Sequence, residues 1–195
     1  MNKDLLIKKA IEQSIETKNK LLENNEIFSL VKNISDEITK AFKSDKKLLV
    51  CGNGGSAADA QHISAEFSGR YYLDRKPLPA EALHVNTSFL TAVANDYSYD
   101  EVYSRMVEAS GREGDVLIGI STSGNSKNVI KAIEMANEKR MITVGFSGSS
   151  GGKMKDICKY MIRIPSEDTP RIQESHILIG HIIAEIVEKE IFDKQ

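Results

Sequence analysis

The first 45 residues carry apolar side chains at the spacing of α-helices. Ile7, Ile11 and Ile15 recur every four residues. A second set recurs every three or four residues and consists of Val31, Ile34, Ile38 and Phe42. This spacing places the apolar side chains on one stripe of each helix, and the neighbouring Asn24 and Asn25 favour a turn between the two. These apolar faces must pack against another surface, which could be the sheet of this chain or a partner chain.

From residue 47 onward, the pattern changes to short apolar runs without polar alternation, which are typical of strands buried on both faces. The runs cover residues 48–51, 116–120, 141–146 and 160–164, with a further short strand expected at 83–85. Helix-like segments lie between them at 56–70, 88–110 with a break near Asp96, 126–139 and 171–192. The alternation predicts an α/β fold, namely a doubly wound, five-stranded, mainly parallel sheet flanked by helices and preceded by two N-terminal helices.

No linker or low-complexity tract divides the chain, and its 195 residues suit one domain of ordinary size. All 13 glycines lie between Gly52 and Gly180, and the first 51 residues contain neither Gly nor Pro. We therefore expect a single domain over residues 1–195. It consists of an N-terminal helical arm at 1–45 and an α/β core at 47–192.

The charge balance narrows the range of partners. The 26 basic and 28 acidic side chains give a formal net charge of -2, which argues against a nucleic-acid binder that works by bulk electrostatics. No apolar run approaches the roughly 18 residues needed to span a bilayer, and the first residues do not resemble a secretory signal. Cys51 and Cys158 cannot form a disulfide framework and indicate a reducing compartment. We expect a cytoplasmic protein with neither nucleic acid nor membrane as a partner.

A loop rich in hydroxyl side chains follows the apolar run at 116–120 and leads into a predicted helix. Its hydroxyl residues are Ser121, Thr122, Ser123 and Ser126. The first N–H groups of a helix have no internal partner, so together with these hydroxyls they suit a phosphate. Ser123 or Ser126 could instead serve as a simple N-cap. One serine would suffice for capping, so four hydroxyls favour an anion-binding loop.

The loop at 52–57 formally matches the dinucleotide fingerprint G-x-G-x-x-A. That fingerprint also requires an acidic residue about 20 positions further on, at the end of a second strand. Asp74 lies near this distance, but no strand is predicted before it, and neither loop continues with a Walker lysine. A small phosphorylated metabolite is therefore favoured over a nucleotide. A third glycine loop, at 147–152, is interpreted as a tight turn from strand to helix.

His62 and Glu66 lie four residues apart on one predicted helix and therefore share a face. The pair fits a surface ion pair, an acid–base pair or half of a metal site. His176 and His181 lie in an apolar segment of the last helix, where a histidine is more commonly a core residue. Gln173 and His181 stand about 12 Å apart along that helix. If both serve one site, we expect that site at a subunit interface, with His181 supplied by a neighbouring chain.

Five segments in this order resemble a known family. They lie at 51–62, 65–70, 94–97, 120–126 and 169–176 and comprise CGNGGSAADAQH, AEFSGR, ANDY, ISTSGNS and TPRIQESH. The chain is similar in these segments to the phosphoheptose isomerases of the sugar isomerase, or SIS, domain superfamily. The resemblance runs from about residue 47 to the end, and the two N-terminal helices share the family's pattern.

The resemblance implies a ketose–aldose isomerase that converts sedoheptulose 7-phosphate to D-glycero-D-manno-heptose 7-phosphate through an enediol. This would be the first step of ADP- or GDP-heptose precursor synthesis for lipopolysaccharide or a surface glycan. It implies Glu66 as the base and His181 as the acid. The substrate-binding positions that it implies are Asn53, Gly54, Gly55, Ser56, Glu66, Arg70, Asn95, Asp96, Ser121, Thr122, Ser123, Ser126 and Gln173.

The resemblance further implies one zinc ion per subunit and a homotetramer with active sites at the subunit interfaces. The metal ligands that it implies are His62, Glu66, Gln173 and His181. A zinc-bound histidine must be neutral, so zinc could act as a Lewis acid in place of an acidic His181. Pro170 stands where some relatives carry Asp, and Asp168 is shifted from that position, so Asp168 receives no catalytic role.

Two alternatives stand beside this function. One is another SIS enzyme that acts on a different phosphosugar, for which the hydroxyl loop would serve equally well. The other is a non-catalytic SIS adaptor of the type associated with the bacterial replication initiator. An adaptor has no need for the combined set of His62, Glu66, Gln173 and His181, so their presence favours an enzyme.

Overall fold

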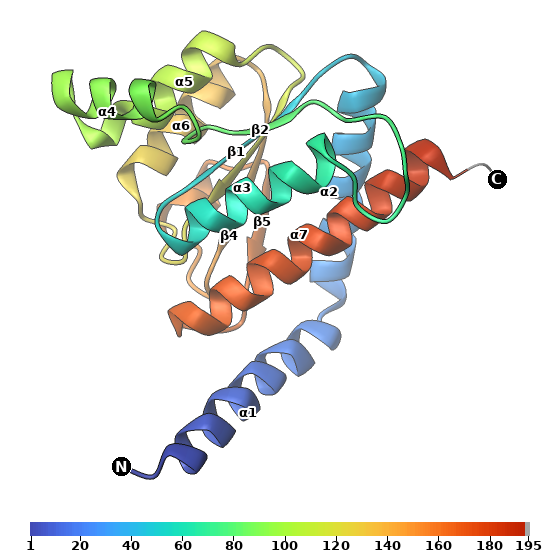
Figure 1. Cartoon of the computed structure of the whole chain (residues 1–195), viewed down its shortest axis with the longest axis vertical. Helices are drawn as coiled ribbons and strands as arrows, with labels where there is room; N and C mark the ends of the chain where they lie inside the picture. Colours follow the sequence, from blue (N-terminus) through green and yellow to red (C-terminus); the bar gives the residue numbers. More distant parts are fainter. Residues whose placement is uncertain (194–195) are drawn as a thin grey trace.

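The computed structural model describes residues 1–193 and holds five strands in one sheet within that range. Their order is β2-β1-β3-β4-β5, and every neighbouring pair is parallel, which confirms the predicted doubly wound α/β fold (Figure 1). The strands are β1 (Leu48–Gly52), β2 (Ala80–Ala82), β3 (Val116–Ile120), β4 (Ile142–Ser147) and β5 (Tyr160–Arg163).

Alternate strand residues point to opposite sides of the sheet, so the continuous apolar runs make both faces apolar. Helices cover both of these faces. In β1, Leu48 and Val50 join the hydrophobic core on one face, and Leu49 and Cys51 join the core on the other. The first core is covered by α2 (Asn25–Lys43), α3 (Gly55–Ser68) and α7 (Thr169–Phe192). The second core is covered by α4 (Thr87–Asp96), α5 (Val102–Ser110) and α6 (Lys127–Glu138). The helices predicted from residue 56 onward begin and end within two residues of these bounds.

One predicted strand was misplaced. The sequence pattern favoured 83–85, whereas β2 pairs Ala80 with Leu48 and ends at Ala82. The backbone N–H of Leu83 still donates to Val50, but the chain then turns away from the sheet. The segment 80–82 lies at the sheet edge and is only partly buried, so its sequence lacks the apolar run that marks a central strand.

The two N-terminal helices differ in what covers their apolar stripes. They separate at the predicted turn, where the Asn24 side chain accepts hydrogen bonds from the N–H groups of Glu26 and Ile27. The stripe of α2, including Ile34 and Ile38, packs into the core of this chain. α1 (Lys3–Leu22) projects from the body (Figure 1). Its apolar stripe of Ile7, Ile11 and Ile15 is exposed. Only α1 therefore extends as an arm.

α7 is the longest helix of the described range, with 24 residues. Pro170 lies in its first turn, where a missing N–H leaves no hydrogen bond unmade. The helix runs beside α3 in the same direction, because Gln173 lies against Gly55 and Gly180 lies against Ile63 (Figure 1). Neither α7 nor any other helix within residues 1–193 is both long and apolar enough to cross a membrane.

Candidate active site

The strand order places two of the predicted ligand loops side by side. β1 and β3 are neighbours, yet α3 leaves β1 toward one face of the sheet and α6 leaves β3 toward the other. Such a point is a topological switch, and ligands of open α/β sheets bind in the crevice outside it. The glycine loop after β1 and the hydroxyl loop after β3 both lie at this crevice.

A pair of asparagines joins these two loops. The Asn53 amide donates to Asn128 Oδ1 at 2.9 Å, and the Asn128 amide donates back to Asn53 Oδ1 at 2.8 Å. The hydroxyl of Tyr99 donates to the same Asn53 oxygen at 3.2 Å. Asn128 is only 3% exposed, so the reciprocal bond holds the Asn53 amide in one orientation. The sequence pattern gave no sign of Asn128 or Tyr99, although Asn128 lies only two residues after Ser126 of the hydroxyl loop.

The hydroxyl loop is organised around Ser121. Its Oγ lies 2.9 Å from Ser126 Oγ and 3.4 Å from Ser123 Oγ. Ser126 occupies the N-cap position of α6, but its side chain accepts no capping hydrogen bond. Gly54, the N-cap residue of α3, has no side chain with which to cap it. At both helix N-termini of the crevice the N-cap residue therefore makes no side-chain capping hydrogen bond, an arrangement that suits an anion.

The third glycine loop, at 147–152, is held against the hydroxyl loop by backbone hydrogen bonds. This agrees with the interpretation of the third loop as a structural turn. The N–H of Gly148 donates to the Thr122 carbonyl at 2.9 Å, and the N–H of Met154 donates to the Gly124 carbonyl at 3.2 Å. Gly124 has a φ of +66°, and a Cβ there would lie 2.2 Å from the Gly151 carbonyl oxygen. The two loops interlock through backbone contacts that only glycine permits at this position.

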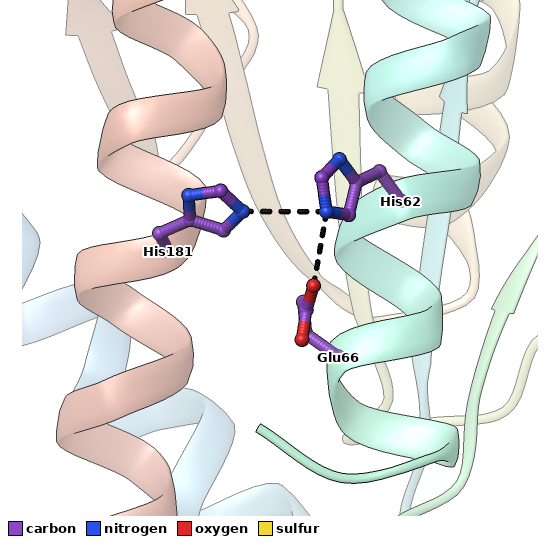
Figure 2. A group of neighbouring side chains, drawn as sticks. All are labelled: His62, Glu66 and His181. Carbon is purple, nitrogen blue, oxygen red and sulfur yellow. Dashed lines mark hydrogen bonds and ion pairs between the residues drawn. The ribbon is translucent and has the colours of Figure 1, made fainter. Parts of the chain in front are cut away.

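His62, Glu66 and His181 form a cluster between α3 and α7 (Figure 2). His62 Nε2 lies 2.9 Å from Glu66 Oε1 and 3.4 Å from His181 Nε2. His62 is half exposed, and the Glu66 side chain is 19% exposed, so solutes can reach the cluster. All three residues belong to one chain. The expectation that a neighbouring chain must bring His181 to His62 and Glu66 is therefore wrong for this cluster.

The donor atoms of the cluster suit zinc. One ligand atom from each of the three residues lies within 4.8 Å of the others, and together they offer two imidazole nitrogens and one carboxylate oxygen. Two histidines and a carboxylate are a common ligand set of catalytic zinc sites, which keep a further position open. The ring of Tyr71 lies beside the cluster, with its centroid 5.8 Å from that of His181.

Gln173 lies at the other end of the α3–α7 contact. A Cβ added to Gly55 would meet its Nε2 at 2.5 Å, so the amide packs directly on the backbone of the first glycine loop. Gly55 precedes His62 by seven residues, or about 10 Å along α3. Gln173 therefore lies at the crevice, about two helical turns before His62.

Comparison with known proteins decides the family. Residues 11–148 match the SIS domain family. The chain is 53% identical to the phosphoheptose isomerase of Clostridium acetobutylicum over 97% of this chain and 96% of that protein. It is 52% identical to phosphoheptose isomerase 2 of Campylobacter jejuni over 99% of this chain and 96% of that protein. The solved phosphoheptose isomerase of Neisseria gonorrhoeae matches with a TM-score of 0.90 and 39% identity, over 95% of this chain and 98% of that one.

The chain belongs to the phosphoheptose isomerases of the SIS domain family. This confirms the resemblance carried by the five sequence segments. The agreement extends over nearly the whole chain, including the N-terminal helices.

Arg70, Asn95 and Asp96 were expected to bind the substrate. Within residues 1–193 their side chains make no hydrogen bond to Asn53 or to the cluster of His62. Arg70 is exposed, and its guanidinium approaches only the Tyr71 carbonyl, at 3.5 Å. The Asn95 amide donates to Asp96 Oδ1 at 2.9 Å in the last turn of α4. Ser56, by contrast, is buried in the first turn of α3. Asp168, at the N-cap of α7, borders an open groove beside α1.

The two histidines of α7 have different environments. His176 is fully buried, and its Nε2 lies 3.1 Å from the Ser147 carbonyl oxygen. Burial lowers the pKa of His176 to about 4, so the ring stays neutral in the core. The expectation of a core histidine is therefore confirmed for His176 and wrong for His181, which faces His62 at the surface.

Proposed function

We propose that this chain converts sedoheptulose 7-phosphate to D-glycero-D-manno-heptose 7-phosphate. The observation that carries the proposal is the cluster of His62, Glu66 and His181 in a member of the phosphoheptose isomerases. A carboxylate beside two imidazoles is suited to moving protons on adjacent sugar carbons. The hydroxyl loop at the crevice supplies a separate place for the phosphate.

We assign phosphate binding to Ser121, Thr122, Ser123 and Ser126 and to the N-terminus of α6. The grouped hydroxyls support this assignment, as does the N-cap residue Ser126, whose side chain makes no capping hydrogen bond. We assign the sugar hydroxyls to the loop of Asn53, Gly54 and Gly55, to Asn95 and Asp96, and to Gln173. Gly55 lets the Gln173 amide approach the loop backbone.

The reaction moves hydrogen between C1 and C2 of the open-chain sugar. Removal of a proton from C1 of the ketose, with protonation of O2, gives an enediol. Return of the carbon-bound proton to C2, with loss of the O1 hydroxyl proton, gives the aldose. Glu66 Oε1 is paired with His62, so we assign Glu66 Oε2 to carry the proton from C1 to C2. In the metal-free protein, His181 is the proposed acid for the sugar oxygens.

We propose zinc as the cofactor, held by His62, Glu66 and His181. Three protein ligands are the usual number for a catalytic zinc site. Bound zinc would polarise a sugar oxygen as a Lewis acid, and a zinc-bound His181 nitrogen would have no proton to donate. Gln173, the fourth residue of the expected ligand set, is proposed to act at the sugar loop, where its amide lies.

We further propose a homotetramer with active sites at subunit interfaces. The apolar stripe of α1 supports this, because exposed apolar surface of this extent calls for a protein partner. The exposed residues of α1 include Leu5, Leu6, Ile7, Ile11 and Ile15. A cytoplasmic location and a role in heptose-containing glycan synthesis remain part of the proposal, and the unpaired Cys51 and Cys158 support the former.

The decisive experiment incubates the protein with sedoheptulose 7-phosphate, with and without a chelator, and follows the sugar by NMR. We expect heptose 7-phosphate to appear, and we expect the chelator to suppress it. Phosphorylated ketoses of five and six carbons serve as comparison substrates, and preferential conversion of one of them would favour another SIS enzyme. A protein that converts none of the three would support the adaptor alternative.

A further inference from the structure

A buried ion pair between Arg75 and Glu188 lies next to the cluster of His62, Glu66 and His181. Arg75 belongs to the segment that joins α3 to β2, and Glu188 belongs to α7. Arg75 Nε donates to Glu188 Oε1 at 2.9 Å, and each side chain is only 2% exposed. A buried charge pair is tolerated when the remaining polar atoms also find partners. Here those partners are backbone groups of the residues that carry or adjoin the cluster.

Arg75 holds the last turn of α3, the turn that carries Glu66. Its Nη2 donates to the Glu66 carbonyl at 2.7 Å, and its Nη1 donates to the carbonyls of Phe67 at 2.7 Å and Gly69 at 3.1 Å. The last carbonyls of a helix lack internal partners, and a cation stabilises that end. One planar guanidinium therefore fixes the backbone from which Glu66 projects toward His62.

Glu188 holds the segment that borders His181. Its carboxylate accepts hydrogen bonds from the N–H groups of Tyr71, Tyr72 and Leu73, at 3.1, 2.8 and 3.0 Å. These bonds fix the backbone at Tyr71, whose ring lies beside that of His181. Glu188 follows His181 by seven residues, which places it about two turns further along the same side of α7. Neither charged group of the pair takes part in the cluster itself.

We propose that Arg75 and Glu188 are positioning residues, which hold Glu66 of α3 and His181 of α7 in register for the isomerase reaction. The inference rests on the proposed function for its kinetic consequence only. A pair that served stability alone would change the free energy of unfolding without displacing the two side chains. A positioning pair must also change the geometry of the cluster.

The test is Glu188→Gln, which keeps the side-chain shape and removes the charge. We expect kcat to fall about 10- to 100-fold, as for other residues that orient metal or catalytic groups, with KM changed less than about threefold. The second readout is the NMR signal of each imidazole Cε1–H, because the chain has only four histidines. The signals of His62 and His181 should shift, whereas those of His84 and His176 should not.

Asp115→Asn is the matched control. Asp115 is 1% exposed, pairs with Lys47 at 2.6 Å and accepts backbone N–H bonds from Lys47 and Arg112. It precedes β3, at the sheet end opposite the crevice. This variant should lose stability as Glu188→Gln does, with kcat and the His62 and His181 signals unchanged. Equal effects of the two variants on kcat and on the signals would overturn the proposal.

A second variant guards against misfolding. Arg75→Lys keeps a positive charge beside Glu188 but lacks the planar fork that reaches the carbonyls of Glu66, Phe67 and Gly69. A folded Arg75→Lys protein with lowered kcat and shifted His62 and His181 signals supports positioning, and wild-type values for both overturn it. If the wild-type protein does not isomerise the heptose phosphate, the proposed function fails, while the histidine signals still test the positioning.

Discussion

His181 of α7 faces His62 of α3, with their Nε2 atoms 3.4 Å apart. The two residues are separated by 119 positions in the chain, and they meet because α3 and α7 run side by side in the same direction. Glu66, one turn beyond His62, completes the group (Figure 2). This contact turns a common i, i+4 pair into a candidate centre for proton transfer or metal binding.

Glu66→Gln is expected to lower isomerisation by about 10²- to 10⁴-fold, the usual contribution of a general base. Substrate binding should persist, because the amide keeps the shape of the carboxylate. Turnover is followed by NMR and binding by titration calorimetry. Glu138→Gln, an exposed change on α6, serves as the control. Near-wild-type turnover in Glu66→Gln would remove Glu66 as the base.

His62→Ala should abolish stoichiometric zinc binding, because it removes one of two imidazole ligands from the cluster. The metal content of the purified protein, measured by mass spectrometry after dialysis against zinc, should fall from about one ion per chain to a trace. Retention of one zinc ion by the variant would show that the metal binds elsewhere. Treatment of the wild-type protein with a chelator should lower turnover, and added zinc should restore it.

Ser126→Ala is expected to raise KM about tenfold or more with little change in kcat. A hydrogen bond to a charged group contributes about 1.5–3 kcal/mol, and loss of uniform substrate binding affects KM alone. Ser110→Ala is the matched control, since its hydroxyl bonds only the Met106 carbonyl within α5. Inorganic phosphate should inhibit the wild-type protein and Ser110→Ala similarly, and Ser126→Ala more weakly. Equal inhibition of all three would remove Ser126 from the phosphate loop.

His176 should make the protein sensitive to acid. Burial lowers its pKa to about 4, below its ordinary value of 6.5, so the unfolded chain binds the proton more tightly. Its contribution to stability is thus present above pH 6.5 and is lost as the pH falls toward 4, by about 3 kcal/mol. The free energy of unfolding, measured with urea across this range, should fall less steeply with acid in His176→Leu. An unchanged slope would contradict a buried neutral imidazole.

Local patterns predicted most of the fold. The apolar runs of β1 and β3 reflect strands that are buried on both faces of the sheet. The helical spacing in α2 and α7 reflects helices that bury one face. β2 was misplaced because an edge strand is only half covered and needs no apolar run. The same apolar spacing could not say that the stripe of α2 is buried in its own chain while that of α1 is exposed.

Within the site, the sequence by itself determined which groups are available: four hydroxyls after a strand, glycines where backbone must approach closely, and a His–Glu pair on one helix face. Only the tertiary structure decided which of them meet. His176 and His181 share one apolar helix, yet the sheet covers the first and leaves the second open to His62. The same holds for Arg75 and Glu188, whose pairing depends on a loop folding back onto α7. Spacing along a helix fixes which face a side chain takes, whereas packing between helices fixes its neighbour and therefore its chemistry.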